Sequence, residues 1–203
     1  MVKRPATQRT IPTSPIERLQ KSPKLLGPLS PLVGIWEGEK GYDLAPSPSR
    51  EKEDTAFRER MTFEPLPPVQ NHEQTLQGLR YSTLAWPVGS ADPFHEDRGY
   101  WLWDPATKEI VRCFVIPRGI TVLAKGHAEP DAHSFELVAE ASSGVNGICS
   151  SPFLEREFKT LSFRLRLTIH DERSFSYEQE SVLQIRGQHG TFSHVDKNTL
   201  KKV

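Results

Sequence analysis

The most regular stretch of this 203-residue sequence is residues 161–169, which read Leu161-Ser162-Phe163-Arg164-Leu165-Arg166-Leu167-Thr168-Ile169. Apolar and polar side chains alternate at every position of this stretch. Successive side chains of a β-strand point to opposite faces of a sheet, whereas a helix places its apolar residues three or four positions apart. The stretch therefore predicts a strand with one buried and one solvent-facing side.

Strand-like stretches recur on both sides of this one, and helical periodicity is absent from Leu32 onward. Short turns separate several of them, at 104–108, 117–119 and 171–173. Alternation and turn residues predict about ten strands in all. Besides 161–169, they are 35–39, 57–64, 76–86, 99–103, 110–116, 119–126, 134–141, 175–185 and 194–203.

Closure into a barrel is the usual way to remove exposed edges from so many antiparallel strands. We therefore expect an all-β fold, an up-and-down antiparallel barrel of the lipocalin and fatty-acid-binding-protein kind. A barrel of this size has room inside for one small ligand. A two-sheet sandwich is the alternative that the strand pattern leaves open.

The N-terminal part differs in composition from the rest of the chain. Residues 1–30 hold six basic residues and one acidic residue, whereas the whole chain has a net charge of zero. Ser14 can cap a helix and Pro15 suits its first position, so we expect a short helix near 15–21, before the prolines that follow it. The sequence thus predicts a basic arm at 1–30 and a ligand-binding barrel at 31–203.

Charge and cysteine content narrow the classes of function. A net charge of zero favours neither nucleic acid nor an anionic membrane as partner, and no apolar run is long enough to span a bilayer. Two cysteines, Cys113 and Cys149, do not make a disulfide framework, and we expect a soluble cytoplasmic protein. Cys113 alternates with Val111 and Val115, which predicts a buried side chain, whereas Cys149 falls in a predicted loop.

Four segments together resemble the nitrobindin family, whose members look like fatty-acid-binding proteins but bind haem. They are Leu32–Gly38 with its Gly-x-Trp-x-Gly pattern, Phe94–Trp101, Ile116–Val122 and the last strand, His194–Val203. The resemblance covers roughly residues 30–203, with the segments in the family's order. Lys40 departs from it where the signature has a glycine, and the last strand holds one more residue between His194 and the basic pair.

The resemblance implies a ten-stranded barrel that holds ferric haem b and isomerises peroxynitrite to nitrate or binds nitric oxide. It implies that His194 is the ligand of the iron. The other expected cofactor-binding residues are His95 as a hydrogen-bond donor, Arg118 as a partner for a propionate, Thr121 on the pocket wall, and Trp36 as the plug of one barrel end.

Other interpretations stay open at this point. His194 could be a surface histidine, with His189 as the competing ligand, and a divalent metal could bind where His127 and His133 flank Asp131. The same cavity could serve a non-catalytic carrier of a fatty acid or other apolar ligand. The barrel could also be an interaction module without a small ligand, and the sequence decides neither enzyme status nor a homodimer.

Overall fold

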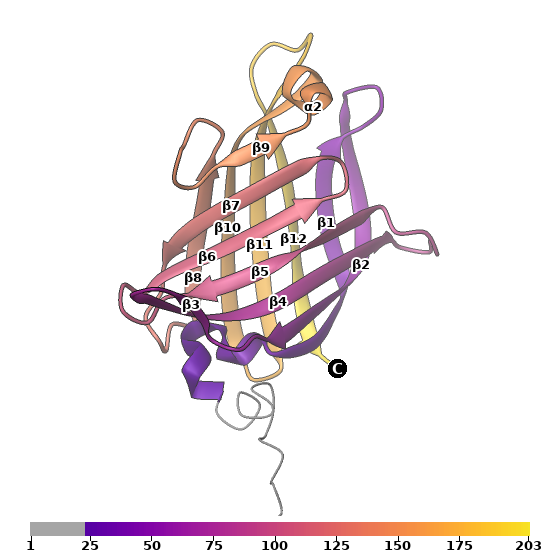
Figure 1. Ribbon diagram of the computed structural model, residues 1–203. Helices are drawn as coiled ribbons and strands as arrows, with labels where there is room; N and C mark the ends of the chain where they lie inside the picture. The colour runs from indigo at the N-terminus through magenta and orange to yellow at the C-terminus, as the bar shows by residue number, and fades with distance from the viewer. Residues whose placement is uncertain (1–22) are drawn as a thin grey trace, which may run out of the picture.

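The computed structural model describes residues 23–203, so the helix predicted at 15–21 lies outside the described residues. Ten strands form a closed antiparallel barrel (Figure 1). They are β1 (Gly34–Pro46), β2 (Lys52–Pro65), β4 (Gln74–Pro87), β5 (His95–Trp103), β6 (Glu109–Ile116), β7 (Ile120–His127), β8 (Ser134–Glu140), β10 (Phe158–Asp171), β11 (Ser174–Ile185) and β12 (Phe192–Lys202).

The ring closes because β1 pairs with both β2 and β12, and β2 pairs in turn with β4. Consecutive strands are neighbours around the rest of the ring, which is the up-and-down order. Two short strands lie off this ring: β3 (Val69–Asn71) pairs with β4, and β9 (Ile148–Ser150) pairs with β7. The prediction of an all-β barrel of about ten strands is confirmed, and a two-sheet sandwich is excluded.

The alternating stretch that predicts the fold lies in β10. Phe163, Leu165, Leu167 and Ile169 are buried in the main hydrophobic core, while the residues between them face outward or are half-buried. The same alternation on the neighbouring β8 buries Phe135, Leu137 and Ala139. One face of each strand thus fills the barrel, as a pattern of period two requires.

One end of the barrel is closed by the 3₁₀ helix η1 (Pro23–Leu32), seen in Figure 1, and by the buried Trp36 of β1. Leu26, Leu29 and Leu32 are completely buried there, so the core includes residues that the predicted boundary at 31 assigned to the arm. The indole N–H of Trp36 donates to the carbonyl of Leu32 at 2.6 Å, and its ring meets Phe175 edge-on at 4.8 Å. Trp36 therefore plugs this end, as expected.

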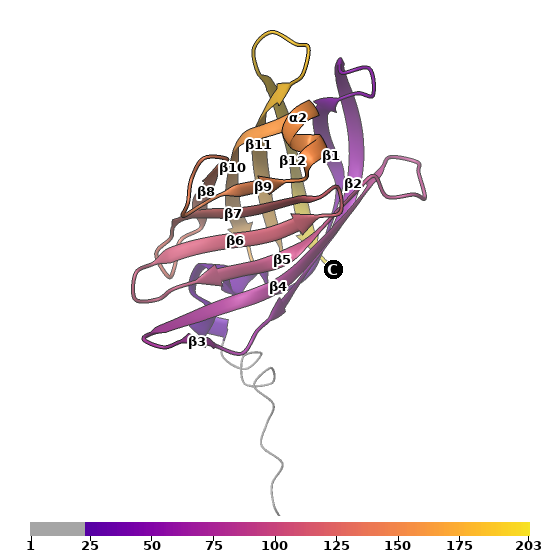
Figure 2. The same ribbon diagram turned by 45° about the horizontal axis from the view of Figure 1, so that its top comes forward.

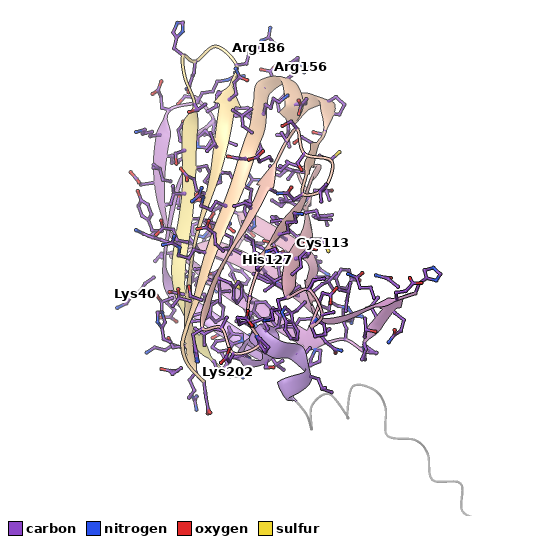
Figure 3. All side chains as sticks on the ribbon, turned by 90° about the vertical axis from the view of Figure 1, so that its left-hand side faces the viewer. Lys40, Cys113, His127, Arg156, Arg186 and Lys202 are labelled. Atoms are coloured by element: carbon purple, nitrogen blue, oxygen red, sulfur yellow. The ribbon has the colours of Figure 1, made fainter. Side chains whose placement is uncertain are left out.

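The opposite end carries α2 (Pro152–Glu157) and β9 (Figure 2). Ser151 caps α2, and Glu157 at its last position is a hydrogen-bond acceptor for three arginines, Arg50, Arg156 and Arg186. Figure 3 shows Arg156 and Arg186 side by side at this end and Lys202 at the other. Within the described part of the chain, no helix has the length and apolarity to cross a membrane.

The structure corrects one prediction about a strand face. In β6 the buried side chains are Ile110, Arg112 and Phe114, so Cys113 lies on the outer face instead of in the core. Val115 beside it is 52% exposed. Cys149 is exposed, but it lies in the short strand β9 instead of the predicted loop, and both cysteines are free thiols. The pattern Val111-Cys113-Val115 predicted the wrong inner face because both faces of β6 carry apolar residues.

Candidate functional site

A β-bulge in β1 determines which side chains of that strand enter the barrel. Between Glu37 and Tyr42, β1 uses one residue more than β12 does, and the register with β2 shifts at the same place. An extra residue reverses the faces of the strand beyond it. Trp36 is therefore buried before the bulge and Asp43 after it, while Lys40 points away from the barrel wall (Figure 3).

Asp43 meets two residues of β12 in the half of the barrel opposite η1, which we call the open half. Strand β12 turns His194, Asp196 and Asn198 toward the interior, and Nε2 of His194 donates to Oδ1 of Asp43 at 2.9 Å. One nitrogen or oxygen atom from each of Asp43, His194 and Asp196 lies within 4.8 Å of the other two. We call these three side chains the Asp–His–Asp cluster.

Burial and neighbouring charges shift the pKa values in this cluster. Burial raises the pKa of Asp196 to about 6, although the charge of His194 and a hydrogen bond from Gln179 act against it. For His194, burial lowers the pKa, but the hydrogen bond to Asp43 and the negative charge of Asp196 outweigh it, so the net pKa is raised. The imidazole is 29% exposed, which leaves it accessible from the open end.

A buried arginine lies at the centre of a second group of polar side chains. Arg112 Nε donates to the hydroxyl of Tyr81 at 3.0 Å, and its terminal nitrogens donate to Asp97 and Gln179, both at 3.2 Å. The guanidinium also lies 4.2 Å from the ring centroid of Phe114. Such contacts with aromatic faces stabilise a desolvated cation.

The two groups are joined through Gln179 of β11. Its Oε1 accepts from Arg112, and its Nε2 donates to Oδ2 of Asp196 at 2.7 Å. Burial would raise the pKa of Asp97, but the charge of Arg112 together with the hydrogen bonds from His95 and Tyr81 and the charge of His95 outweighs burial and holds that pKa below its usual range. Asp97 thus stays ionised beside Arg112, and the interior carries a connected polar network.

A third polar group contains a carboxyl that is protonated at neutral pH. Glu59 of β2 accepts hydrogen bonds from Tyr177 at 3.0 Å and from Asn198 at 2.8 Å. Burial raises its pKa to about 8, even though both hydrogen bonds lower it. This group stabilises the contact between β2, β11 and β12 and carries no charge near pH 7.

Three of the five predicted site residues gather at the open end. Nε2 of His95 lies 3.3 Å from Oδ2 of Asp97, and the charge of His95 also acts on Asp196. Arg118 is exposed in the turn after β6, where it donates to the carbonyl of Phe94 at 3.2 Å and its charge acts on His194. His194, His95 and Arg118 therefore share one site.

The other two predicted residues lie elsewhere. Trp36 is at the closed end. It pairs with Lys202 at one end of β12, whereas Leu44, beside Asp43, pairs with Val195 near the other end. Thr121 does not line the interior: its side chain is exposed, and the inward residues of β7 are Val122 and Ala124. Thr121 borders instead a hollow of about 600 Å³ on the outer surface, together with Arg80, Arg98, Tyr100, Cys113 and Val115.

The competing histidines do not form a site. His189 is exposed in the loop between β11 and β12. His127, Asp131 and His133 are exposed and do not converge, since across residues 23–203 the one group of three potential metal ligands is the Asp–His–Asp cluster. The metal site suggested at residues 127–133 is therefore wrong.

Asp43, Asp196 and Arg112 are site residues that the sequence did not reveal. Asp196 stands two positions from His194 and so shares its face on a strand, which was a usable signal. The paired glycines Gly38 and Gly41 mark the place of the bulge that turns Asp43 inward, although glycines alone do not prove one. Nothing within β6 indicates that Arg112 has partners on other strands.

Comparison with known proteins agrees with this architecture. The sequence model of the THAP4-like, heme-binding beta-barrel domain matches residues 25–202. Among solved structures, the crystal structure of Rv2717c from M. tuberculosis superimposes with a TM-score of 0.62 at 20% sequence identity, over 91% of this chain and 96% of that one. No curated protein sequence matches the chain.

Proposed function

Because this chain belongs to the family of THAP4-like, heme-binding beta-barrel domains, we propose that it binds haem b and that His194 is the ligand of the iron. The observation that carries the proposal is the position of His194, which faces the interior from the last strand with its imidazole 29% exposed at the open end. With His194 as its ligand, the iron would be able to bind a small molecule as well.

The donor chemistry of the site fits this group. Metal-bound histidines commonly donate a ring N–H to a carboxylate, which fixes the ring, and His194 has such a partner in Asp43. The exposed Arg118 supplies a cation near His194, and a guanidinium suits a propionate carboxylate. His95 on the adjacent wall supplies a second nitrogen donor. We assign the axial role to His194 and the carboxylate-holding role to Arg118.

When bound, ferric haem would supply the iron at which peroxynitrite is isomerised to nitrate or nitric oxide binds. The protein's part in that activity would be to hold the haem and to present one exposed cation, Arg118, near His194. Arg118 would attract the peroxynitrite anion, and we propose that His95, whose Nε2 contacts Asp97, donates a hydrogen bond to an oxyanion through its other ring nitrogen. We also propose a reducing, cytoplasmic location, which the two free thiols support.

A titration of the purified protein with hemin tests the axial role. We expect a Soret shift that saturates at one hemin per chain and is lost in His194→Ala. The matched control is His189→Ala, which removes an exposed histidine five positions earlier and should bind hemin as the parent does. A Soret shift that persists unchanged in His194→Ala, with far-UV circular dichroism showing both variants folded, would contradict the assignment.

Stopped-flow decay of peroxynitrite tests the activity separately. We expect the hemin-loaded protein to accelerate the decay with nitrate as product, and Arg118→Gln to slow it. If the protein binds hemin but does not accelerate the decay, the haem assignment stands and the isomerase activity is rejected.

A carrier of fatty acids or other apolar ligands is the weaker candidate. Placing an apolar molecule against charged side chains removes their water at a cost in free energy, and the interior of the open half presents three aspartates and an arginine. An interaction module without a small ligand would be favoured by a hemin titration that shows no change at all.

A further inference from the structure

The spacing of donor atoms in the Asp–His–Asp cluster matches that of ligands around one metal ion. Divalent ions bind histidine nitrogen and carboxylate oxygen at about 2.0–2.2 Å, so two ligands at right angles lie about 3 Å apart. Nε2 of His194 and Oδ1 of Asp43 are 2.9 Å apart. The third donor, an oxygen of Asp196, lies within 4.8 Å of both.

The types of donor select a class of ion. One imidazole and two carboxylates suit Mn²⁺, Fe²⁺ or Zn²⁺, whereas a soft ion such as Cu⁺ prefers thiolates or thioethers. Three protein ligands are fewer than these ions take, so positions remain for water or a substrate. The exposed fraction of the His194 side chain gives the ion a path from solvent.

The surroundings of the cluster support it as a ligand set. Gln179 holds Oδ2 of Asp196 at 2.7 Å and is itself held by Arg112, so the carboxylate is oriented by a second layer of hydrogen bonds. Metal-binding carboxylates usually have such partners.

The charge of the interior is an independent observation that points to a cation. Asp43, Asp97 and Asp196 bring three carboxylates into the open half, and within the described part of the chain Arg112 is the one fully buried basic side chain. In addition, Oδ1 of Asp97 is buried without a hydrogen-bond partner. Apart from the histidines, the formal charge is three negative against one positive, and buried charge is costly unless it is compensated. A divalent ion would balance it.

We propose that the haem-free barrel binds one divalent cation of the Mn²⁺ or Zn²⁺ class through Asp43, His194 and Asp196. This site goes beyond haem binding because it needs no porphyrin and adds two carboxylate ligands from β1 and β12. Since His194 serves in both, haem and the divalent ion exclude each other on one chain.

Metal uptake by the haem-free, chelator-treated protein tests the proposal. Loss of the six-line electron paramagnetic resonance signal of free Mn²⁺, and calorimetric titration with ZnCl₂, should each give one ion per chain. We expect His194→Ala and Asp196→Asn to weaken both affinities at least tenfold. Asp131→Asn, which alters an exposed aspartate between two histidines that do not converge with it, should leave them unchanged.

A measurement on the unaltered chain guards against variants that do not fold. Substoichiometric Mn²⁺ should broaden the amide NMR signals near Asp43 and Asp196 first and leave those near Trp36 and Lys202, at the other end of the same strands, sharp. No uptake of either ion, uptake unchanged by both substitutions, or broadening elsewhere would overturn the proposal. Because none of these readouts involves hemin, failure of the haem assignment is seen separately, in the Soret titration.

Discussion

Arg112 is the residue on which the polar interior depends most directly. Its side chain is 5% exposed and it contributes hydrogen bonds to three other strands, through Tyr81, Asp97 and Gln179. Removing one partner of a buried ion pair leaves the other charge uncompensated, which costs more than the pair itself contributes. The arginine therefore stabilises the barrel by allowing Asp97 to stay inside it.

We predict that Arg112→Met lowers the free energy of unfolding by about 3–5 kcal/mol, the usual cost of breaking a buried pair. Urea unfolding at pH 7 measures it. The double variant Arg112→Met/Asp97→Asn should recover part of the loss, because the unpaired carboxylate is gone. Arg98→Met is the control: Arg98 is on the outer face of β5 and 69% exposed, so its loss should stay within about 0.5 kcal/mol. Equal losses at Arg112 and Arg98 would refute the role of Arg112.

At the scale of single residues the sequence predicted some site positions and missed others for a definable reason. His194 was predicted because a family resemblance assigned it a role, and the structure places it on the inner face of β12. Arg112 was missed because its partners Tyr81 and Asp97 belong to β4 and β5, and alternation within β6 alone favours the apolar face with Cys113. Thr121 was misplaced by one position, which on a strand is a change of face.

At the scale of elements, strand positions were predictable because alternation and turn residues are local signals, as in β10 and in the hairpin between β5 and β6. The bulge in β1 was not predictable, because it is defined only by register against β2 and β12. Its effect is large for the site, since Asp43 reaches His194 only beyond it. The short α2 also escaped prediction, although Ser151-Pro152 is a helix start.

Gly126 of β7 lies where β7 and β8 approach each other closely. A Cβ built on Gly126 would lie 1.9 Å from the backbone carbonyl oxygen of Glu136 in β8, which cannot move without separating the strands. We predict that Gly126→Ala costs about 1–3 kcal/mol in urea unfolding, as overpacking does.

The matched control is Gly144→Ala, in the loop after β8, where a Cβ would meet nothing within 4 Å. That substitution should be neutral to within about 0.5 kcal/mol. If both alanine variants are equally stable, the close approach of β7 and β8 does not constrain the barrel.

Glu157 connects three segments at the open end. Arg50 from the loop after β1 and Arg186 after β11 both lie 2.9 Å from its carboxylate, and Arg156 lies at 3.0 Å. Hydrogen bonds from these arginines lower the pKa of Glu157 to about 2. A lowered pKa means that the stabilisation is present above the ordinary value of 4.5 and is lost as the pH falls toward 2.

We therefore expect Glu157→Gln to lower Tm at pH 7, with the difference from the parent shrinking as the pH is lowered to 3. Differential scanning calorimetry across this range measures it. Glu155→Gln on the same helix removes a carboxylate whose partner is the single Lys159, and should lower Tm less. A Tm difference for Glu157→Gln that does not depend on pH would contradict the ion-pair explanation.

At the scale of the whole molecule, the interior of the barrel changes in character along its length. The η1 end is apolar, with Trp36 and Phe175, the carboxylates, Arg112 and the histidines lie beyond it, and a second apolar cluster of Leu183, Ile185 and Phe192 lies toward α2. Closure was predictable from strand number, because unpaired edges are avoided. The polarity of the interior was not, since it results from residues on β1, β2, β5, β6 and β12 that meet only after closure.

This distribution of buried carboxyls sets the pH dependence of stability for the haem-free protein. Glu59 and Asp196 have raised pKa values, about 8 and about 6, so the stabilisation linked to their protonation is lost as the pH rises through those values. Asp97 and Glu157 have lowered pKa values, so their contribution is lost as the pH falls. We predict a stability maximum at about pH 4–5, more acidic than the usual range of about 5–8.

Glu59→Gln tests the larger of the two contributions to the loss of stability at alkaline pH, that of Glu59. A pKa raised from 4.5 to about 8 corresponds to on the order of 5 kcal/mol lost between about pH 4 and pH 9, at about 1.4 kcal/mol per unit. Glutamine keeps an acceptor for Tyr177 and Asn198 but cannot ionise, so the variant should be the more stable protein at pH 9 and show a flatter profile in urea unfolding. If the parent and Glu59→Gln lose stability in parallel from pH 5 to pH 9, then Glu59 is ionised inside the folded barrel, and the charge in the interior is balanced by another group.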